Sequence, residues 1–526
     1  MLGSTPALDV PARIYQRLIA DDADEAAEIA STEIEKTSVI SFYDAVGIEV
    51  LRLASEASLQ NASAEHRMRL ASGMDSLLDD LRDEYPCSLG PEAKPRVNPS
   101  STAFQNCLLG GAGNAPSTCC VVGAGPAGLM LGLLLARAGV DVTVLEKHSD
   151  FLRDFRGDTV HPSTLEVMHE LGLLDGLLKL PHTQAPRLHA EIDGKDITIA
   201  NFSRLPTRCR FIAFMPQWDF LDYVAREAAR FPSFHLIVQA AVTELIDEND
   251  RIVGVRAATP NGELEIRTEL VVGADGRNST VREKAGLKIE RFGSPRDVLW
   301  IELSHRPGDP PFVMGHGGPR QGFVMIDRGD YWQCGYVVRK GSFDDVKAAG
   351  LDAFRAAVAS ISPLPPDRMD EVRSWDDVHT LSIRIDRLKN WWRPGLLCIG
   401  DAAHAMSPIG GFGVNLAIQD AVAAANILAA PLRDGRLADK HLAAVEARRS
   451  FPTKATQKVQ LMMQRARSRR EATDNGQQNG PPSFMRRIAR WPILAHLAGR
   501  LVGLGFRTEH VQEQAPNLRA REGTTA

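Results

Sequence analysis

The stretch V-V-G-A-G-P-A-G, residues 121–128, decides the fold of this chain. It follows a short apolar run, Cys119 to Val122, and opens a run of small residues and leucines that predicts a helix over Pro126 to Ala138. The apolar stretch D-V-T-V-L, residues 141–145, predicts the next strand. Strand, glycine turn, helix and strand in this order form a βαβ unit, which implies a parallel sheet and a right-handed crossover.

The glycines of this stretch and an acid after it predict a nucleotide-binding site. Gly123 permits the tight turn out of the strand, Gly125 lets the backbone approach a pyrophosphate, and Gly128 lets the helix pack close to the sheet. The helix N-terminus offers free N–H groups to the phosphates. Glu146 lies 23 residues after Gly123, at the end of the second predicted strand, where it can accept hydrogen bonds from ribose hydroxyls. The alternative is a structural glycine turn with an ordinary surface Glu146.

Two later glycine–acid motifs favour FAD as the resident cofactor. The stretch V-V-G-A-D-G-R-N-S contains Asp275 and Gly276, and the stretch L-C-I-G-D-A-A-H-A contains Gly400 and Asp401. Each stretch begins with an apolar run, so each acid is expected at the end of a strand. A simple NAD dehydrogenase needs neither acid, whereas the ribityl chain of FAD needs a partner for its hydroxyls, and Asp401 suits that role. Alternatively, both acids are turn or N-cap residues.

The glycine-rich loop after Asp401 predicts close contact with a flavin ring. It carries Pro408, Gly411 and Gly413 before a helix that is expected to start near Asn415. Small residues let the backbone approach the ring, and a helix N-terminus stabilises the negative charge of reduced flavin. Phe412 is a large residue for such a loop: it either restricts flavin movement and substrate entry or packs against the neighbouring helix.

In this order and at this spacing, the three motifs resemble those of the group A flavoprotein monooxygenases, the para-hydroxybenzoate hydroxylase-like family. The resemblance covers residues 119–432, with a weaker match as far as residue 511. It implies an α/β fold in which a Rossmann-type FAD-binding domain is interleaved with a β-sheet substrate domain. It assigns cofactor contacts to Gly123, Gly125, Gly128, Glu146, Arg156, Gln217, Asp275, Gly276, Gly400, Asp401, Pro408, Gly411, Gly413 and Asn415.

Three of these assignments rest on the resemblance alone. It places Arg156, in D-F-R-G-D, near the ribityl chain and pyrophosphate, and Gln217, in M-P-Q-W-D, against the flavin. It gives the Asp275 motif a shared role toward FAD and the incoming nicotinamide cofactor. No second GxGxxG motif follows for NAD(P)H, which agrees with a family in which that co-substrate binds only transiently.

The resemblance implies an NAD(P)H-dependent monooxygenase that uses O₂ to hydroxylate an aromatic or polyketide-like small molecule through a flavin C4a-hydroperoxide. This scheme requires no catalytic base, so the catalytic residues stay unassigned and His404 is expected to be structural. Alternatives are an FAD-dependent reductase or dehydrogenase, a halogenase of the same fold, and a non-catalytic flavin-binding protein. The halogenase is disfavoured because Trp391-Trp392-Arg393 does not match the W-x-W-x-I-P signature of tryptophan halogenases.

The amino-acid composition argues against several other classes of protein. The chain has 526 residues, 44% of them hydrophobic and 24% charged, and a net charge of −5, which argues against a general nucleic-acid binder. Its seven cysteines lack metal-ligand spacing, so we expect no metal site and a reducing compartment. The apolar run from Leu129 to Ala136 is far shorter than the ~20 residues of a membrane span. We therefore expect a cytoplasmic protein without a membrane span, and leave its oligomeric state open, a homodimer being one option.

Changes in composition along the chain predict its domains. We expect a helical N-terminal appendage over residues 1–87, a Pro- and Gly-rich linker over 88–117, the interleaved FAD and substrate domains over 118–450, and a C-terminal helical segment over 451–526. Within the third range, the substrate domain is expected at about 182–215 and 295–390. Individual strands are expected at 211–214, 252–257, 264–270 and 331–339.

Overall fold

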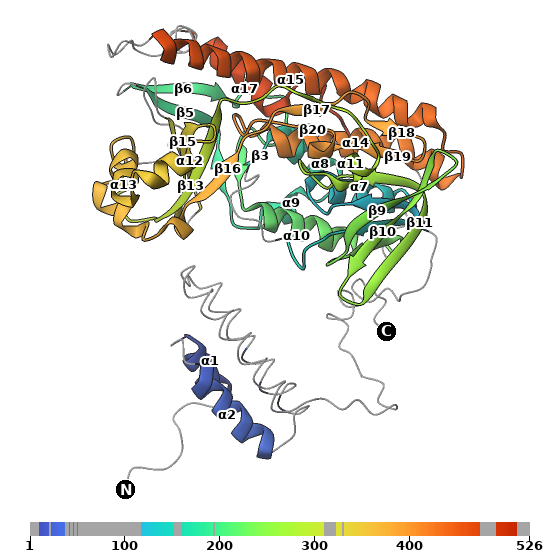
Figure 1. Ribbon diagram of the computed structural model, residues 1–526, viewed down its shortest axis with the longest axis horizontal. Helices are drawn as coiled ribbons and strands as arrows, with labels where there is room; N and C mark the ends of the chain where they lie inside the picture. The colour runs from blue at the N-terminus through green and yellow to red at the C-terminus, as the bar shows by residue number, and fades with distance from the viewer. Residues whose placement is uncertain are drawn as a thin grey trace. The chain divides into compact units, whose positions relative to one another are not determined.

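The computed structural model describes residues 10–19, 23–36, 42, 46, 50, 117–151, 159–192, 195–309, 322–328, 331–473 and 491–512. The chain divides into two compact units, Met1–Val97 and Asn98–Ala526, which are drawn in Figure 1. The larger unit has helices packed on several sheets, which confirms the expected α/β class.

The larger unit alternates strands and helices in its first part. Its α-helices are α7 (Pro126–Arg137), α8 (Pro162–Glu170), α9 (Leu174–Leu177), α10 (Gln217–Ala228), α11 (Thr280–Lys284), α12 (Phe343–Ala348), α13 (Leu351–Ala359), α14 (Phe412–Arg433), α15 (Asp439–Thr473) and α17 (Pro492–Leu504). Its 3-10 helices are η2 (Pro366–Glu371), η3 (Trp375–Asp377) and η4 (Gly400–Ala402).

The strands follow the same sequence order. They are β1 (Ser117–Val122), β2 (Val142–Leu145), β3 (Thr159–Val160), β4 (Thr183–Ala185), β5 (Arg187–Ile192), β6 (Lys195–Asn201), β7 (Ile212–Phe214), β8 (Phe234–Ile237), β9 (Ala241–Glu248), β10 (Arg251–Thr259), β11 (Gly262–Gly273), β12 (Ile289–Arg291), β13 (Arg296–Ser304), β14 (Gly322–Asp327), β15 (Tyr331–Arg339), β16 (His379–Ser382), β17 (Asp386–Leu388), β18 (Trp392–Arg393), β19 (Leu396–Cys398) and β20 (His404–Ala405). The strand expected at 331–339 matches β15, and those expected at 252–257 and 264–270 fall within β10 and β11. The strand expected at 211–214 contains β7, which starts one residue later.

The main sheet has the strand order β18-β19-β11-β1-β2-β8, and β9 and β10 extend from β11. The pairs that join β19, β11, β1, β2 and β8 are all parallel, as the βαβ unit predicts. Helix α14 packs on α7 and on α15, and α10 packs on α7, so helices cover the sheet (Figure 1). Strand β1 and helix α7 are apolar and almost fully buried, because parallel strands between helices have no solvent face.

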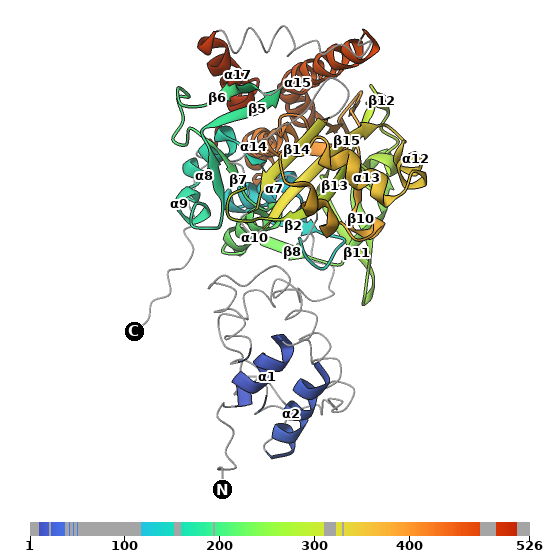
Figure 2. The same cartoon turned by 90° about the vertical axis from the view of Figure 1, so that its left-hand side faces the viewer.

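A second sheet, with the order β14-β15-β13-β16, is antiparallel (Figure 2). Its strands lie within the range 295–390 expected for the substrate domain, so we name it the substrate sheet. One face of it packs on α13 through Leu299, Ile301 and the fully buried Trp332. The other face carries Val298 and Trp300, since side chains alternate along a strand. Gly335 pairs with Trp300, and a Cβ at Gly335 would lie 2.9 Å from the indole, so this glycine makes room for the ring.

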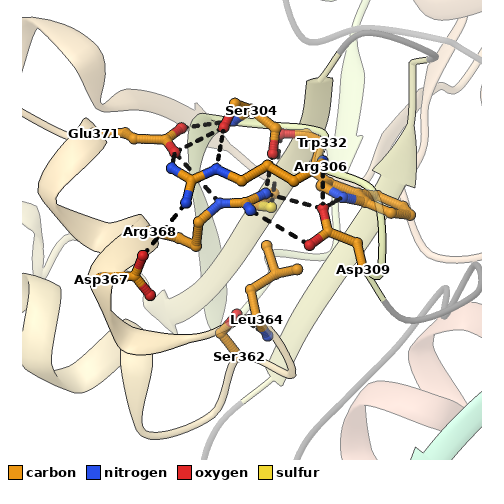
Figure 3. A network of polar contacts seen from close by, with 10 residues as sticks. Ser304, Arg306, Asp309, Trp332, Ser362, Leu364, Asp367, Arg368 and Glu371 are labelled. Carbon is orange, nitrogen blue, oxygen red and sulfur yellow. Dashed lines mark hydrogen bonds and ion pairs between the residues drawn. The ribbon is translucent and has the colours of Figure 1, made fainter.

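A buried ion network fastens η2 to the substrate sheet (Figure 3). The Arg368 guanidinium is 2% exposed and lies 2.9 Å from an oxygen of Asp309 and 3.3 Å from one of Glu371. Asp309 also accepts from the Trp332 indole N–H at 2.8 Å. Burial alone would raise the pKa of Asp309, but hydrogen bonds from the Arg306 backbone, Trp332 and Arg368 hold it below its usual value. The carboxylate therefore stays charged and compensates the buried cation.

The structure refines several predicted boundaries. Residue 117 begins β1 and so belongs to the sheet, and residue 450 lies inside α15, so no element ends there. Helix α14 begins at Phe412, not near Asn415, because Gly411 adopts the left-handed conformation as its N-cap. In the smaller unit, α1 (Val10–Ile19) and α2 (Ala23–Lys36) share an apolar core that includes Ile14 and Ala30, while residues 88–116 of the predicted linker lie outside the described residues.

Helix α14 is long and apolar enough to cross a membrane by length and composition, yet 72% of its apolar window is buried inside the protein. It is thus the core helix between α7 and α15.

The ion network predicts the stability of the substrate sheet. We expect Asp309→Ala to lower the free energy of unfolding by about 3–5 kcal/mol, because it leaves the buried Arg368 without its closest carboxylate. The control is Asp367→Ala, whose side chain is 63% exposed at 3.4 Å from Arg306 and should contribute under ~1 kcal/mol. Urea unfolding followed by circular dichroism measures both, and equal effects would contradict the assignment.

Candidate cofactor-binding and active site

The predicted cofactor motifs meet at one edge of the main sheet. The carboxyl ends of β1, β2, β11 and β19 lie side by side, because these strands are neighbours and parallel. The glycine turn follows β1, Glu146 follows β2, Asp275 lies two residues after β11, and Gly400 lies two residues after β19. Open α/β sheets bind their ligands at this edge.

The glycine turn has the geometry of a phosphate cradle. Gly123 has φ +101°, and a Cβ there would lie 2.6 Å from the Ala274 carbonyl oxygen. A Cβ at Gly128 would lie 1.9 Å from the Gly123 oxygen, so the turn and α7 touch. Gly125 caps the N-terminus of α7 in extended conformation, and a Cβ there would meet nothing within 4 Å. The space beside Gly125 therefore fits a pyrophosphate at a helix N-terminus.

Glu146 is buried and holds the glycine turn. Its carboxylate accepts from the Ala124 N–H at 3.0 Å and from the His148 N–H at 3.1 Å. A carboxylate has about four acceptor positions, which suits a group that holds the turn and also accepts from ribose hydroxyls. The surface-residue alternative is wrong for Glu146, which is 7% exposed.

The two carboxylate oxygens of Asp275 have different surroundings. One oxygen accepts from the Val281 N–H at 3.1 Å, near the start of α11. The N-cap of that helix is Ser279, so the N-cap alternative is wrong for Asp275. The other oxygen is buried and has no hydrogen-bond partner among the residues that the structure describes. Burial raises the pKa of this carboxyl, and its hydrogen bonds only partly oppose the rise. A buried oxygen without a partner fits a hydroxyl donor such as those of FAD.

A buried carboxylate on α14, Asp420, fixes the second glycine–acid motif. It accepts from the Gly400 N–H at 3.2 Å, contacts His404 Nε2 at 2.6 Å and accepts from Arg449 Nε at 2.8 Å. Burial would raise its pKa, but the charges and hydrogen bonds of His404 and Arg449 lower the pKa overall. His404 is 1% exposed and held by Asp420, which agrees with the structural role expected for it. Asp401 is half-buried beside Gly400.

The loop that carries Pro408 ends at the N-terminus of α14. Gly411 has φ +64°, and a Cβ there would lie 2.3 Å from Thr159 Oγ1. At Gly413 a Cβ would meet nothing within 4 Å, so this side of the first turn is open. Phe412 packs edge-on against the His161 ring, with centroids 6.1 Å apart, which supports the packing role over the gating role.

The side-chain amide of Asn415 makes all of its hydrogen bonds within the protein. Its oxygen accepts from the His161 N–H at 2.8 Å and from Thr164 Oγ1 at 2.7 Å, and its nitrogen donates to the carbonyls of Thr159 at 3.1 Å and Gly411 at 3.0 Å. An amide side chain makes about four hydrogen bonds, so none is left for a ligand. Asn415 thus positions the loop, and only its backbone can face a cofactor.

His161 is the N-cap of α8, which begins at Pro162. Its Nδ1 lies 2.8 Å from the Val502 carbonyl and therefore carries the proton, while Nε2 is buried without a partner among the described residues. Burial lowers the pKa of His161 to about 4, so the ring is neutral near pH 7.

For two of the predicted cofactor-binding residues, the structure gives little or no information on the side chain. Arg156 lies outside the described residues. Gln217 is half-buried as the first residue of α10, after the turn at Pro216. Sequence reasoning missed Asp420 and Arg449, although a charged residue inside the apolar run of α14 is an available signal, because charges are seldom fully buried without a partner.

Comparison with known proteins agrees with this geometry. The FAD binding domain family matches residues 117–459. The chain belongs to this family. FAD is therefore its cofactor, and the resemblance to flavoprotein monooxygenases is confirmed.

Relatives of this FAD-binding chain include two proteins of Streptomyces. The chain is 33% identical to the 6-methylpretetramide 4-monooxygenase of Streptomyces rimosus over 356 residues, which is 67% of this chain and 85% of that protein. It is 28% identical to the dialkyldecalin synthase of Streptomyces rugosporus over 319 residues, 58% of this chain and 63% of that protein. Among solved structures, the OxyS anhydrotetracycline hydroxylase from Streptomyces rimosus has a TM-score of 0.58 at 22% identity, covering 74% of this chain and 76% of that one, and shows the shared fold.

The glycine turn predicts two distinct effects of an added methyl group. We expect Gly125→Ala to weaken FAD binding by about 1–3 kcal/mol, since its Cβ would occupy the space for the pyrophosphate, and to leave the melting temperature of the FAD-free protein unchanged. Gly128→Ala should instead lower that melting temperature, because its Cβ would overlap the Gly123 oxygen. Fluorescence titration with FAD and thermal unfolding separate the two; unchanged FAD affinity in Gly125→Ala would place the pyrophosphate elsewhere.

Asp401 predicts a further loss of affinity. We expect Asp401→Ala to weaken FAD binding by about 1.5–3 kcal/mol, roughly tenfold or more, through lost charge-assisted hydrogen bonds to ribityl hydroxyls. The exposed Asp434, at the far end of α14, provides the control variant Asp434→Ala. If a folded Asp401→Ala protein keeps the parental dissociation constant for FAD, Asp401 does not bind the ribityl chain.

Proposed function

We propose that this chain is an NAD(P)H-dependent monooxygenase that uses FAD and O₂ to hydroxylate a phenolic or polyketide-like aromatic molecule. The observation that carries the proposal is the similarity to the 6-methylpretetramide 4-monooxygenase, which extends over 85% of that protein. The cofactor motifs and the substrate sheet both lie within the family match. The unit Met1–Val97 lies before that match, so we assign it no catalytic role.

The chain's own groups would hold the adenine half of FAD at the first motif. Gly125 and the N-terminus of α7 would take the pyrophosphate, because free N–H groups and the helix dipole favour phosphate there. Glu146, which follows β2 at the same edge of the sheet, would accept from the ribose hydroxyls. Its bond to Ala124 couples the ribose contact to the shape of the turn.

Asp275 and Asp401 would take hydroxyls of the ribityl chain and its surroundings, and the open side of Gly413 would lie against the ring. The first turn of α14 has N–H groups without helical partners, which stabilise negative charge close to the start of the helix. When bound, FAD supplies hydride transfer from NAD(P)H and the activation of O₂. The protein contributes position, charge stabilisation and exclusion of water.

Neither of the two histidines beside this loop, His161 and His404, is placed to act as a catalytic base, which agrees with a reaction carried out by the cofactor. His404 is paired with Asp420, and His161 is buried with a pKa of about 4. Neither is an exposed base near neutral pH. Because α14, the one described helix apolar enough to span a membrane, forms part of the core, we also propose a cytoplasmic enzyme without a membrane span.

The proposal predicts oxygen transfer that depends on an aromatic substrate. Purified protein should oxidise NAD(P)H slowly alone and several-fold faster with its phenolic substrate, and one atom of ¹⁸O₂ should enter the product. The measurements are absorbance at 340 nm, oxygen uptake and mass spectrometry over a panel of phenols and polyketide-like aromatics.

The rival functions give other results in the same assay. Label from water, or turnover that persists without oxygen, indicates a reductase or dehydrogenase. Tight FAD binding without NAD(P)H oxidation on any panel member indicates a non-catalytic flavin-binding protein.

A further inference from the structure

Gln333, on β15 of the substrate sheet, is a buried amide with half of its hydrogen-bonding capacity unused. It is 2% exposed. Its oxygen accepts from Arg328 Nε at 2.9 Å and from a second nitrogen of the same guanidinium. Its nitrogen is buried and has no partner among the described residues. Buried polar groups are rarely left unpaired, so this amide nitrogen calls for an acceptor other than the described residues of the chain.

The chemistry of Arg328 fixes which way this amide faces. A guanidinium only donates hydrogen bonds, so it requires the amide oxygen, not the nitrogen, on its side. Both contacts from Arg328 go to that one oxygen. The two N–H donors of Gln333 are therefore turned away from Arg328 and held in one orientation.

The strand register shows which face of the sheet carries Gln333. It pairs with Ile326 on β14 and with Glu302 on β13, so all three side chains share a face. Ile326 packs against two apolar clusters: one includes Trp300, and the other includes Phe214 on β7. The face with Gln333 therefore looks toward β7.

The elements opposite this face lead directly to the flavin loop. Phe214 pairs with Thr159, whose hydroxyl lies 3.4 Å from the Gly411 carbonyl. Val502 of α17 packs on the same cluster as Phe214, and its carbonyl binds the His161 ring. A molecule held at Gln333 would thus lie on the side of the substrate sheet that faces the proposed flavin site.

Two more buried polar atoms without partners lie on these opposite elements. They are Thr183 Oγ1, on the β4 strand that pairs with Phe214, and His161 Nε2. Apolar surroundings with a few polar groups directed inward are typical of sites for small organic ligands.

We propose that Gln333 is a specificity-determining residue of the substrate site, where its amide nitrogen donates to a ketone, amide or phenolic oxygen of the aromatic substrate. Arg328 is the positioning residue that keeps this nitrogen turned toward the substrate. This inference rests on the proposed function.

The exchange Gln333→Glu tests the role, because it keeps the shape and the oxygen facing Arg328 but replaces both N–H donors with an acceptor. Binding is measured by the change that anhydrotetracycline or para-nitrophenol produces in the visible spectrum of the FAD-loaded full chain. We expect the dissociation constant of the bound phenol to rise at least tenfold, with FAD occupancy and melting temperature preserved. Gln184→Glu, an exposed exchange of the same charge on β4, should leave the constant unchanged.

The outcomes separate this inference from the proposed function. If Gln333→Glu binds the phenol as the parent does, Gln333 only braces Arg328 and the inference is wrong, whatever the oxygen assay shows. If neither phenol perturbs the flavin of the parent, the proposed acceptor chemistry is wrong. If Gln333→Glu does not yield FAD-loaded protein, Gln333→Met, which has similar size and no donor, takes its place, and parental affinity in that variant overturns the inference.

Discussion

The carboxylate of Asp420 is the point at which the cofactor edge of the sheet is held together. It is fully buried, and it binds the Gly400 backbone, the His404 ring and the Arg449 guanidinium at once. Arg449 in turn contacts Glu509 at 3.2 Å. A buried ion of either sign is very unfavourable alone, so each member of this chain of contacts depends on the others. The loop between β19 and α14 is therefore held by these contacts on the side that faces α14 and α15, and its opposite side can face a ligand.

A second constraint is steric. At Gly123, Gly128 and Gly411 the neighbouring atoms come so close that a Cβ has no place, whereas Gly125 and Gly413 border open space. The first group shapes the loops and the second group leaves room for what binds between them. Glycines of one motif thus have two different roles, close packing and space for a ligand, and the positions of the surrounding atoms distinguish them.

The sequence predicted the parts of the site that are set by local spacing. The βαβ unit, the glycine turn, Glu146 and the strand-end positions of Asp275 and Asp401 each follow from a single continuous segment of the chain. It did not predict that the Asn415 amide donates hydrogen bonds to the carbonyls of Thr159 and Gly411, or that Gln333 faces β7. Those contacts depend on pairing between segments that are distant in the sequence. His161 to Asn415 spans 254 positions, and no periodicity encodes such a contact.

The order of strands in the main sheet has a consequence for synthesis and folding. Strand β19 completes the cofactor edge, yet it follows β13–β16 in the chain, and Glu509 supplies the last partner of the buried ions. A growing polypeptide therefore emerges from the ribosome with its nucleotide half exposed and incomplete until the substrate sheet and helix α17 have been made. The cofactor edge is therefore complete only when β19 and Glu509 have been made, so a chain that ends before them would leave the buried end of β11 without its neighbour β19.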